Sequence, residues 1–298
     1  MTIQEREKLT ANFRALQALG ETGLAETRAA LSHLEKALPV PGDARIALVD
    51  AGGVAAEWVS APAVETAAGK ALLYLHGGGY VYCGPGTHRL LAYNLSAATG
   101  MPCLLAAYRL APEYPYPAAV EDAVAAYGWL LAQGYQADRL AVAGDSAGGG
   151  LTLATMLRLQ QLGLPLPAAI ACLSPWTDLT MAGASIVGKV AADPLVQPAD
   201  LERCASWYLG KGDRTAPLAS PLFGDLAGLP PLLIQVGSEE ILLDDASRLA
   251  ARATAAGVTV DYQCWDQMFH VWQLYAPMLS EGRDAIASVG EFLGQHVH

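Results

Sequence analysis

The sequence predicts an α/β protein in which an eight-stranded, mostly parallel sheet is flanked by helices. Three observations support this prediction. Short apolar runs of the kind that form buried strands recur along the chain. Helix-like stretches alternate with the later runs, an order that favours right-handed crossovers covering both faces of a parallel sheet. The length of 298 residues suits one large domain with a deep core.

Eight segments of the chain are predicted to form strands. Residues 45–49 and 54–59 are β-type runs separated by Ala51-Gly52-Gly53, which indicates a hairpin. Continuous apolar runs predict the other strands, at residues 71–75, 102–107, 140–143, 168–173, 231–236 and 258–264. Apolar residues at helical spacing predict helices at residues 88–99, 118–133, 147–162, 241–256 and 281–295. Ligands of such sheets bind beyond the carboxyl ends of the strands.

Two segments fall outside the alternating pattern. Residues 3–38 have apolar side chains at helical spacing and predict either a helical pair on the surface or a cap over a pocket. Residues 177–217 contain no strand-like run, but 198–209 predicts a helix with proline at its start and glycine just past its end. We therefore expect an N-terminal cap part at 1–40, a cap insertion at 178–216, and an α/β core formed by 41–177 and 217–298.

Composition limits the classes of function. The net charge is −11 and no Lys/Arg cluster occurs, so we expect no nucleic-acid partner. No apolar run is long enough to span a membrane, and the charged N-terminus lacks the apolar region of a secretory signal, so we expect a cytoplasmic protein. The five cysteines are scattered and predict reduced thiols, with neither a zinc site nor a disulfide framework.

The pentapeptide Gly144-Asp145-Ser146-Ala147-Gly148 has the form Gly-x-Ser-x-Gly and lies between a predicted strand and a predicted helix. This is the context of a nucleophile elbow, in which a serine occupies a strained turn and glycines allow close approach. The start of the helix also favours an anion. The alternative is a tight turn with an ordinary N-cap serine.

A serine nucleophile needs a base, and an acid to orient that base. His270 follows the last predicted strand, which gives the order serine, acid, histidine of α/β-hydrolases. His76 is the other candidate, because the remaining histidines lie in helices or in the tail: His33, His88, His296 and His298. The acid is expected in the loop after the strand at 231–236, where spacing does not choose among Glu239, Glu240, Asp244 and Asp245.

The segment His76-Gly77-Gly78-Gly79-Tyr80 follows the predicted strand at 71–75 directly. Three consecutive glycines form a backbone that can turn its N–H groups towards a ligand, as in the oxyanion loop after the third strand of α/β-hydrolases. With the N–H group of Ala147, this loop would supply the donors that a developing oxyanion requires. A flexible glycine turn is the alternative.

In combination, these motifs resemble the hormone-sensitive-lipase-like family of α/β-hydrolase carboxylesterases. Further motifs of the resemblance are Tyr108-Arg-Leu-Ala-Pro-Glu113, Tyr116-Pro-Ala-Ala119 and Ser174-Pro-Trp176. The resemblance implies Ser146 as nucleophile and His270 as general base, with the N–H groups of Gly78, Gly79 and Ala147 as the oxyanion hole. It implies that His76 braces the loop, and that Asp145 and residues 108–113 are scaffold.

The resemblance also bears on the acid. Family members usually carry Asp-Pro-Leu-x-Asp after the seventh strand, with the first Asp as the acid. Here the stretch reads Glu240-Ile-Leu-Leu-Asp244, so the acid falls on Glu240 and Asp244 remains an alternative.

The expected function is hydrolysis of short- to medium-chain carboxylic esters through an acyl-enzyme, with no metal and no organic cofactor. Tyr80, Trp176 and Phe269 are candidates for substrate binding, with core packing as the alternative. The expected partner is a small ester, and a homodimer is the default assembly. Two other functions are open: an amidase or arylformamidase on the same scaffold, and a catalytically silent ligand-binding protein.

Overall fold

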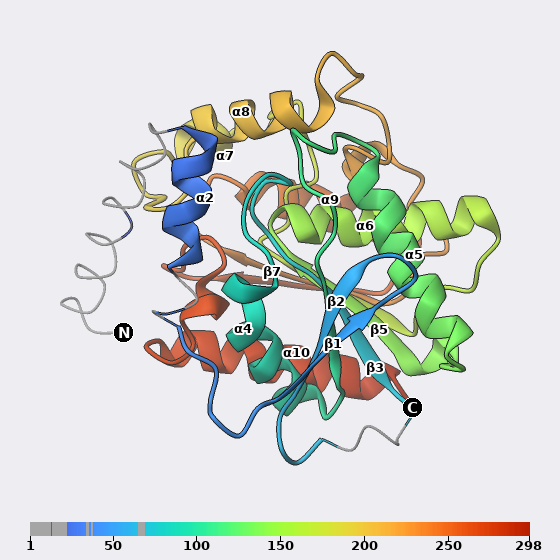
Figure 1. Ribbon diagram of the computed structural model, residues 1–298. Coiled ribbons are helices and arrows are strands. Elements are labelled where there is room, and N and C mark those ends of the chain that lie inside the picture. Colours follow the sequence, from blue (N-terminus) through green and yellow to red (C-terminus); the bar gives the residue numbers. More distant parts are fainter. Residues whose placement is uncertain (1–12, 14–22, 34–35, 37, 65–68) are drawn as a thin grey trace.

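The computed structural model describes residues 13, 23–33, 36, 38–64 and 69–298, and one twisted sheet runs through its centre (Figure 1). The sheet has eight strands in the order β1-β2-β4-β3-β5-β6-β7-β8. β2 is antiparallel to both of its neighbours, and all other pairs are parallel. The strands are β1 (Arg45–Asp50), β2 (Ala55–Ser60), β3 (Ala71–Leu75), β4 (Cys103–Ala106), β5 (Leu140–Asp145), β6 (Ala169–Leu173), β7 (Leu232–Gly237) and β8 (Val260–Trp265). All eight predicted strands form.

Helices cover both faces of the sheet. Alternate side chains of each buried strand point to opposite faces, so that Leu73 and Val142 pack with one helical layer while Leu72 and Ala141 pack with the other. The first layer contains α5 (Ala118–Ala132), α6 (Ala147–Leu162) and α9 (Leu243–Ala255). The second contains α4 (Pro85–Thr99) and α10 (Ser280–His296). The predicted helices are confirmed, and α4 begins three residues earlier than its predicted start at 88.

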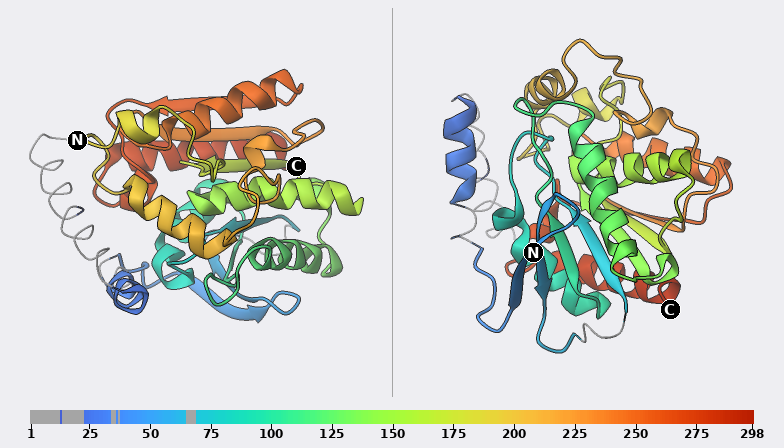
Figure 2. Two further views of the ribbon diagram at one scale, coloured as in Figure 1. Left: turned by 90° about the horizontal axis from the view of Figure 1, so that it is seen from above. Right: turned by 45° about the vertical axis from the view of Figure 1, so that its right-hand side comes forward.

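Further helices lie over the end of the sheet at which α6 begins (Figures 1 and 2). They are α2 (Leu24–Ser32), α7 (Ser185–Gly188) and α8 (Pro198–Leu209). The predicted helix at 198–209 is therefore confirmed. The helical prediction for residues 3–38 is confirmed at α2, whereas its residues 3–12, 14–22, 34–35 and 37 lie outside the described residues.

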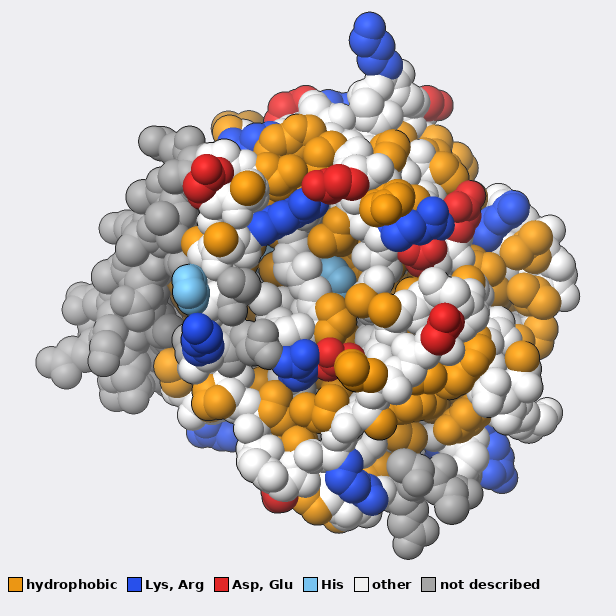
Figure 3. Space-filling model, in the orientation of Figure 1, with side chains coloured by type: hydrophobic (Ala, Val, Ile, Leu, Met, Phe, Trp, Pro, Cys, Tyr) orange, Lys and Arg blue, Asp and Glu red, His pale blue; other side chains and the backbone are white. Residues whose placement is uncertain are grey.

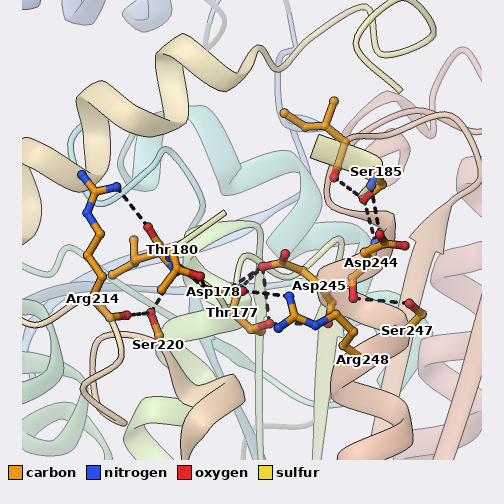
Figure 4. A network of polar contacts seen from close by, with 12 residues as sticks. Thr177, Asp178, Thr180, Ser185, Arg214, Ser220, Asp244, Asp245, Ser247 and Arg248 are labelled. Carbon is orange, nitrogen blue, oxygen red and sulfur yellow. Dashed lines mark hydrogen bonds and ion pairs between the residues drawn. The ribbon is translucent and has the colours of Figure 1, made fainter. Parts of the chain in front are cut away.

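A polar network connects the start and the end of the insertion between β6 and β7 to α9 (Figure 4). The Asp245 carboxylate of α9 accepts the N–H groups of Thr177 at 2.7 Å and Asp178 at 2.9 Å. Arg248 of the same helix pairs with Asp178 at 2.8 Å. Near the end of the insertion, Ser220 Oγ accepts the N–H group of Leu179 at 2.8 Å. The insertion is thereby anchored at its base, next to the carboxyl ends of β6 and β7.

None of the helices in the described part of the chain is long and apolar enough to cross a membrane.

Candidate active site

Ser146 occupies the turn between β5 and α6 with φ +53° and ψ −122°. A residue with a side chain rarely adopts this backbone conformation, and it persists only where its surroundings enforce it. The Ser146 N–H group donates to Leu173 O at 2.8 Å, and its carbonyl accepts the N–H group of Trp176 at 2.9 Å. The neighbouring strand therefore holds the serine in the turn that the sequence predicted.

The glycines around Ser146 are required by close packing. A Cβ on Gly148 would lie 1.9 Å from Leu75 O, and a Cβ on Gly144 would lie 2.3 Å from Gly148 O. Both contacts are with backbone atoms, which cannot swing aside as a side chain can. Helix α6 therefore lies directly against the end of β3, where the glycine loop begins.

His270 and Glu240 meet although they lie in different loops. His270 follows β8, and Glu240 lies in the loop between β7 and α9. The imidazole Nδ1 is 2.7 Å from Glu240 Oε2, and both side chains are buried. Two of the competing carboxylates are engaged elsewhere, because Asp244 accepts the N–H group of Ser185 at 2.9 Å and Asp245 accepts that of Thr177.

The charges around His270 favour its protonated form. Burial by itself lowers the pKa of the imidazole, but the hydrogen bond and negative charge of Glu240 raise it. The carboxylates of Asp193 and Asp145 raise it further, so that the net direction is upward. A base with a raised pKa holds a proton more readily when it takes one from a nucleophile.

The glycine loop follows β3 and faces the serine turn. Gly78 and Gly79 have φ values of +109° and +62°, a region that favours glycine. Gly77 donates its N–H group to Asp145 Oδ1 at 2.9 Å, which fixes the start of the loop. Within the described residues, the N–H groups of Gly78 and Gly79 donate to no backbone carbonyl. Ala147 is the first residue of α6, a position whose N–H group has no partner within its own helix.

This architecture matches known proteins. A family model described as alpha/beta hydrolase fold matches residues 72–274. The chain is an α/β-hydrolase. It is 52% identical over 253 residues to an acetyl-hydrolase of Streptomyces hygroscopicus, a match that covers 85% of this chain and 82% of that protein.

Further likenesses narrow the family. An esterase of Acinetobacter venetianus is 35% identical over 266 residues, which cover 89% of this chain and 87% of the relative. The crystal structure of an esterase from the bacterial hormone-sensitive lipase family has a TM-score of 0.97 and 45% identity, with 100% of both chains covered. The hydrolase therefore belongs to the hormone-sensitive-lipase-like group, and the predicted fold class is confirmed.

A cavity of about 260 Å³ joins the parts of the site in this hydrolase. Ser146, His270, Gly78 and Gly79 line it together. The segments over this end of the sheet contribute mainly apolar side chains to its walls, among them Leu31 of α2, Leu195 and Val196 of the insertion, and Leu201 and Cys204 of α8. On the face shown in Figure 3 the surface is hollowed below α8, with apolar and charged side chains around the hollow.

The three substrate-binding candidates are placed behind the cavity wall. Tyr80, Trp176 and Phe269 are buried and are not among the residues that line the cavity. Tyr80 stacks on Tyr208 with ring centroids 3.9 Å apart, and Phe269 packs 5.0 Å from Phe13. Phe269 therefore supports a lining residue, because Phe13 itself faces the cavity.

The scaffold residues of the hydrolase form a buried polar cluster beneath the glycine loop. The Asp145 carboxylate accepts the Tyr74 hydroxyl at 2.8 Å and faces His88 Nε2 at 3.3 Å. Burial lowers the pKa of His76 to about 4, so its imidazole is neutral and Nδ1 donates to Gly77 O at 2.7 Å. The His76 ring stacks on Tyr108 at 4.3 Å. These contacts brace the loop.

Sequence reasoning singled out the Ser174-Pro-Trp176 motif without assigning a contact to its serine. Ser174 Oγ donates to Glu240 Oε1 at 2.9 Å and accepts the N–H group of Val271 at 3.0 Å. The serine thus joins the acid to the loop that carries His270. A polar residue directly after a buried strand was the available signal, but its partners lie 66 and 97 residues away.

The described residues contain no group of three or more His, Cys, Asp or Glu side chains that could hold a metal ion.

Proposed function

We infer that the protein is a serine carboxylesterase. Ser146 is its nucleophile, His270 its general base and Glu240 the acid that orients the base. The N–H groups of Gly78, Gly79 and Ala147 form its oxyanion hole. The observation that carries the proposal is the shared cavity, which Ser146 and His270 both line while His270 is paired with the buried Glu240. The acetyl-hydrolase and esterase names of its relatives support the same reaction class.

The reaction proceeds in two halves. Ser146 Oγ attacks the ester carbonyl while His270 Nε2 takes its proton, and the bond to Glu240 at Nδ1 fixes the imidazole tautomer that this step requires. The imidazolium then protonates the leaving alcohol, and water repeats the sequence on the acyl-enzyme. Loss of one oxyanion donor typically raises the barrier by about 3–4 kcal/mol.

The cavity supports a small substrate. Its volume of about 260 Å³ lies below the range in which drug-sized ligands usually bind. The apolar side chains from α2 and α8 favour an uncharged acyl chain over an acyl chain that carries a charge. We therefore propose short- to medium-chain esters, with α2 and the insertion acting as the cap.

Substitution of the serine tests the nucleophile. Ser146→Ala should abolish turnover of p-nitrophenyl acetate and butyrate and labelling by a fluorophosphonate, while circular dichroism stays that of the wild type. Turnover at the wild-type rate in the folded variant would exclude Ser146.

Paired substitutions test the acid. Glu240→Gln removes the charge next to His270 and should lower kcat by about 10⁴-fold, by analogy with the loss of the acid in other serine triads. Asp244→Asn should change kcat little, because Asp244 contacts Ser185 rather than His270. A large loss of kcat in Asp244→Asn together with a small one in Glu240→Gln would instead identify Asp244 as the acid.

An oxyanion hole also serves amides, so matched ester and anilide substrates test the amidase alternative.

A homodimer, a cytoplasmic location and the absence of a nucleic-acid partner remain predictions from the sequence. Sedimentation and cell fractionation would test the first two, and a gel-shift assay the third.

A further inference from the structure

Asp193 is a buried carboxylate that the reaction described above does not use. It lies in the insertion between α7 and α8, and 3% of its surface is exposed. Its Oδ1 accepts the N–H groups of Leu195 and Val196, both at 2.9 Å. Its Oδ2 accepts the N–H group of Ile241 at 2.9 Å. The charge of a buried carboxylate is expensive unless such donors satisfy it.

These three bonds connect the cap to the catalytic loop. Leu195 and Val196 line the cavity, so Oδ1 holds one part of its wall in place. Ile241 follows Glu240 directly in the chain, so Oδ2 holds the backbone that presents the acid to His270. A single side chain of the insertion therefore fixes both a wall of the cavity and the base of the acid loop.

The charge of Asp193 also acts on His270. Three carboxylates from different elements favour the imidazolium: Glu240 of the β7–α9 loop, Asp193 of the insertion and Asp145 at the end of β5. Glu240 bonds the ring directly, and the charge of Asp145 is shared with His88 and Tyr74. Asp193 has backbone N–H donors as its hydrogen-bond partners, which leave its negative charge unneutralised.

We propose that Asp193 is a positioning residue for ester hydrolysis: it holds the loop that presents Glu240 and stabilises the positive charge that His270 acquires when Ser146 attacks. This inference rests on the proposed triad. It implies that the cap insertion contributes to the rate of the chemical step as well as to the shape of the cavity.

The test is Asp193→Asn. The amide oxygen can still accept from Leu195 and Val196, but the charge is lost and the amide group at the Oδ2 position cannot accept from Ile241. We expect kcat for p-nitrophenyl butyrate to fall about tenfold, because a small displacement of a catalytic group has effects of this order or larger. We also expect the acid limb of the kcat/KM profile to move down by about half a pH unit, because a negative charge near the imidazole has been removed.

Asp213→Asn is the matched control. Asp213 is another carboxylate of the insertion region that accepts a nearby N–H group, that of Thr215 at 2.8 Å, but at the exposed surface. The control should leave kcat and the pH profile unchanged. If Asp193 had only a structural role, the Asp193→Asn variant would have a lower Tm than the wild type, but the acid limb of its kcat/KM profile would not move.

Asp193→Glu separates position from charge. The glutamate side chain keeps the negative charge but is one methylene group longer, so its oxygen atoms no longer match the N–H groups. We therefore expect a lowered kcat, with the acid limb of the kcat/KM profile near that of the wild type. Wild-type kcat and an unshifted limb in a folded Asp193→Asn variant would overturn the proposal, as would wild-type kcat in Asp193→Glu. NMR titration of His270 gives a further readout: its pKa should be lower in Asp193→Asn than in the wild type, and equal pKa values in the two proteins would overturn the proposal. Activity that survives Ser146→Ala would instead overturn the proposed function, so the two failures are distinguishable.

Discussion

Gly148→Ala is the sharpest test of how closely helix α6 packs against the end of β3. The added Cβ would lie 1.9 Å from Leu75 O and 2.5 Å from His76 O. An ordinary contact between carbon and carbonyl oxygen begins near about 3.3 Å, so helix α6 and the end of β3 must separate by roughly 1.4 Å. That movement displaces Ser146 from the glycine loop, and a misplacement near 1 Å costs about 10²-fold in rate.

The expected result combines a loss of activity with a loss of stability. We expect kcat/KM for p-nitrophenyl butyrate to fall about 10²-fold, because Ser146 lies at the start of α6, whereas Gly78 and Gly79, the proposed oxyanion donors, follow β3. Overpacking of this kind costs about 1–3 kcal/mol, which urea unfolding would measure as a lower midpoint at an unchanged slope.

Gly128→Ala is the control for this experiment. Gly128 lies within helix α5, and a Cβ there would meet nothing within 4 Å. The same substitution should therefore stabilise the protein by about 0.5–1 kcal/mol through helix propensity, with kcat/KM unchanged. If Gly148→Ala matched this control in both activity and stability, the reasoning from backbone contact would be refuted.

Three further predictions concern ionisable groups. Arg28 donates to Val81 O and Ala111 O at 2.9 and 2.8 Å, so Arg28→Ala should loosen α2 over the cavity. We expect KM to rise severalfold and stability to fall by about 1–2 kcal/mol, and an unchanged KM would contradict this. The acid limb of wild-type kcat/KM should have its midpoint above 6.5, because carboxylates raise the pKa of His270 although burial alone would lower it. A lower midpoint would argue against these charges. Burial raises the pKa of Asp245 from 3.8 to about 7, so the folded state binds its proton more tightly than the unfolded state does. The contribution of this group to stability is therefore full below about pH 4 and declines as the pH rises to about 7. Urea unfolding of Asp245→Asn across this range should show a flatter pH dependence than the wild type.

Several features could be predicted from the sequence because their causes are local. Each buried strand is a short apolar run between turn residues, and each crossover helix carries its own periodicity. The elbow was predictable because a serine between glycines needs only its immediate neighbours to form the turn. Its place between β5 and α6 follows from the same local pattern.

Pairings between loops were decided by the tertiary structure. Four carboxylates within seven residues have equivalent sequence neighbourhoods, and they differ in the direction that the loop after β7 gives each side chain. That direction depends on Ser174, whose hydroxyl bonds Glu240, and on Asp193, which holds Ile241. Both residues are distant in the chain, so no local pattern reports their contact.

The walls of the cavity show the same division. Trp176 and Phe269 lie near strand ends, where the sequence predicts a ligand, yet both are packed behind the residues that line the cavity. Whether an aromatic side chain faces a cavity or the core depends on which segments fold over it. Phe269 packs against Phe13, and Trp176 lies beside Tyr80, which stacks on Tyr208 of α8. The sequence by itself determined the sheet, the elbow and the order of the chemical groups, because these depend on short-range patterns. The tertiary structure decided which acid meets the histidine and which side chains face the cavity, because both depend on segments brought together only by folding.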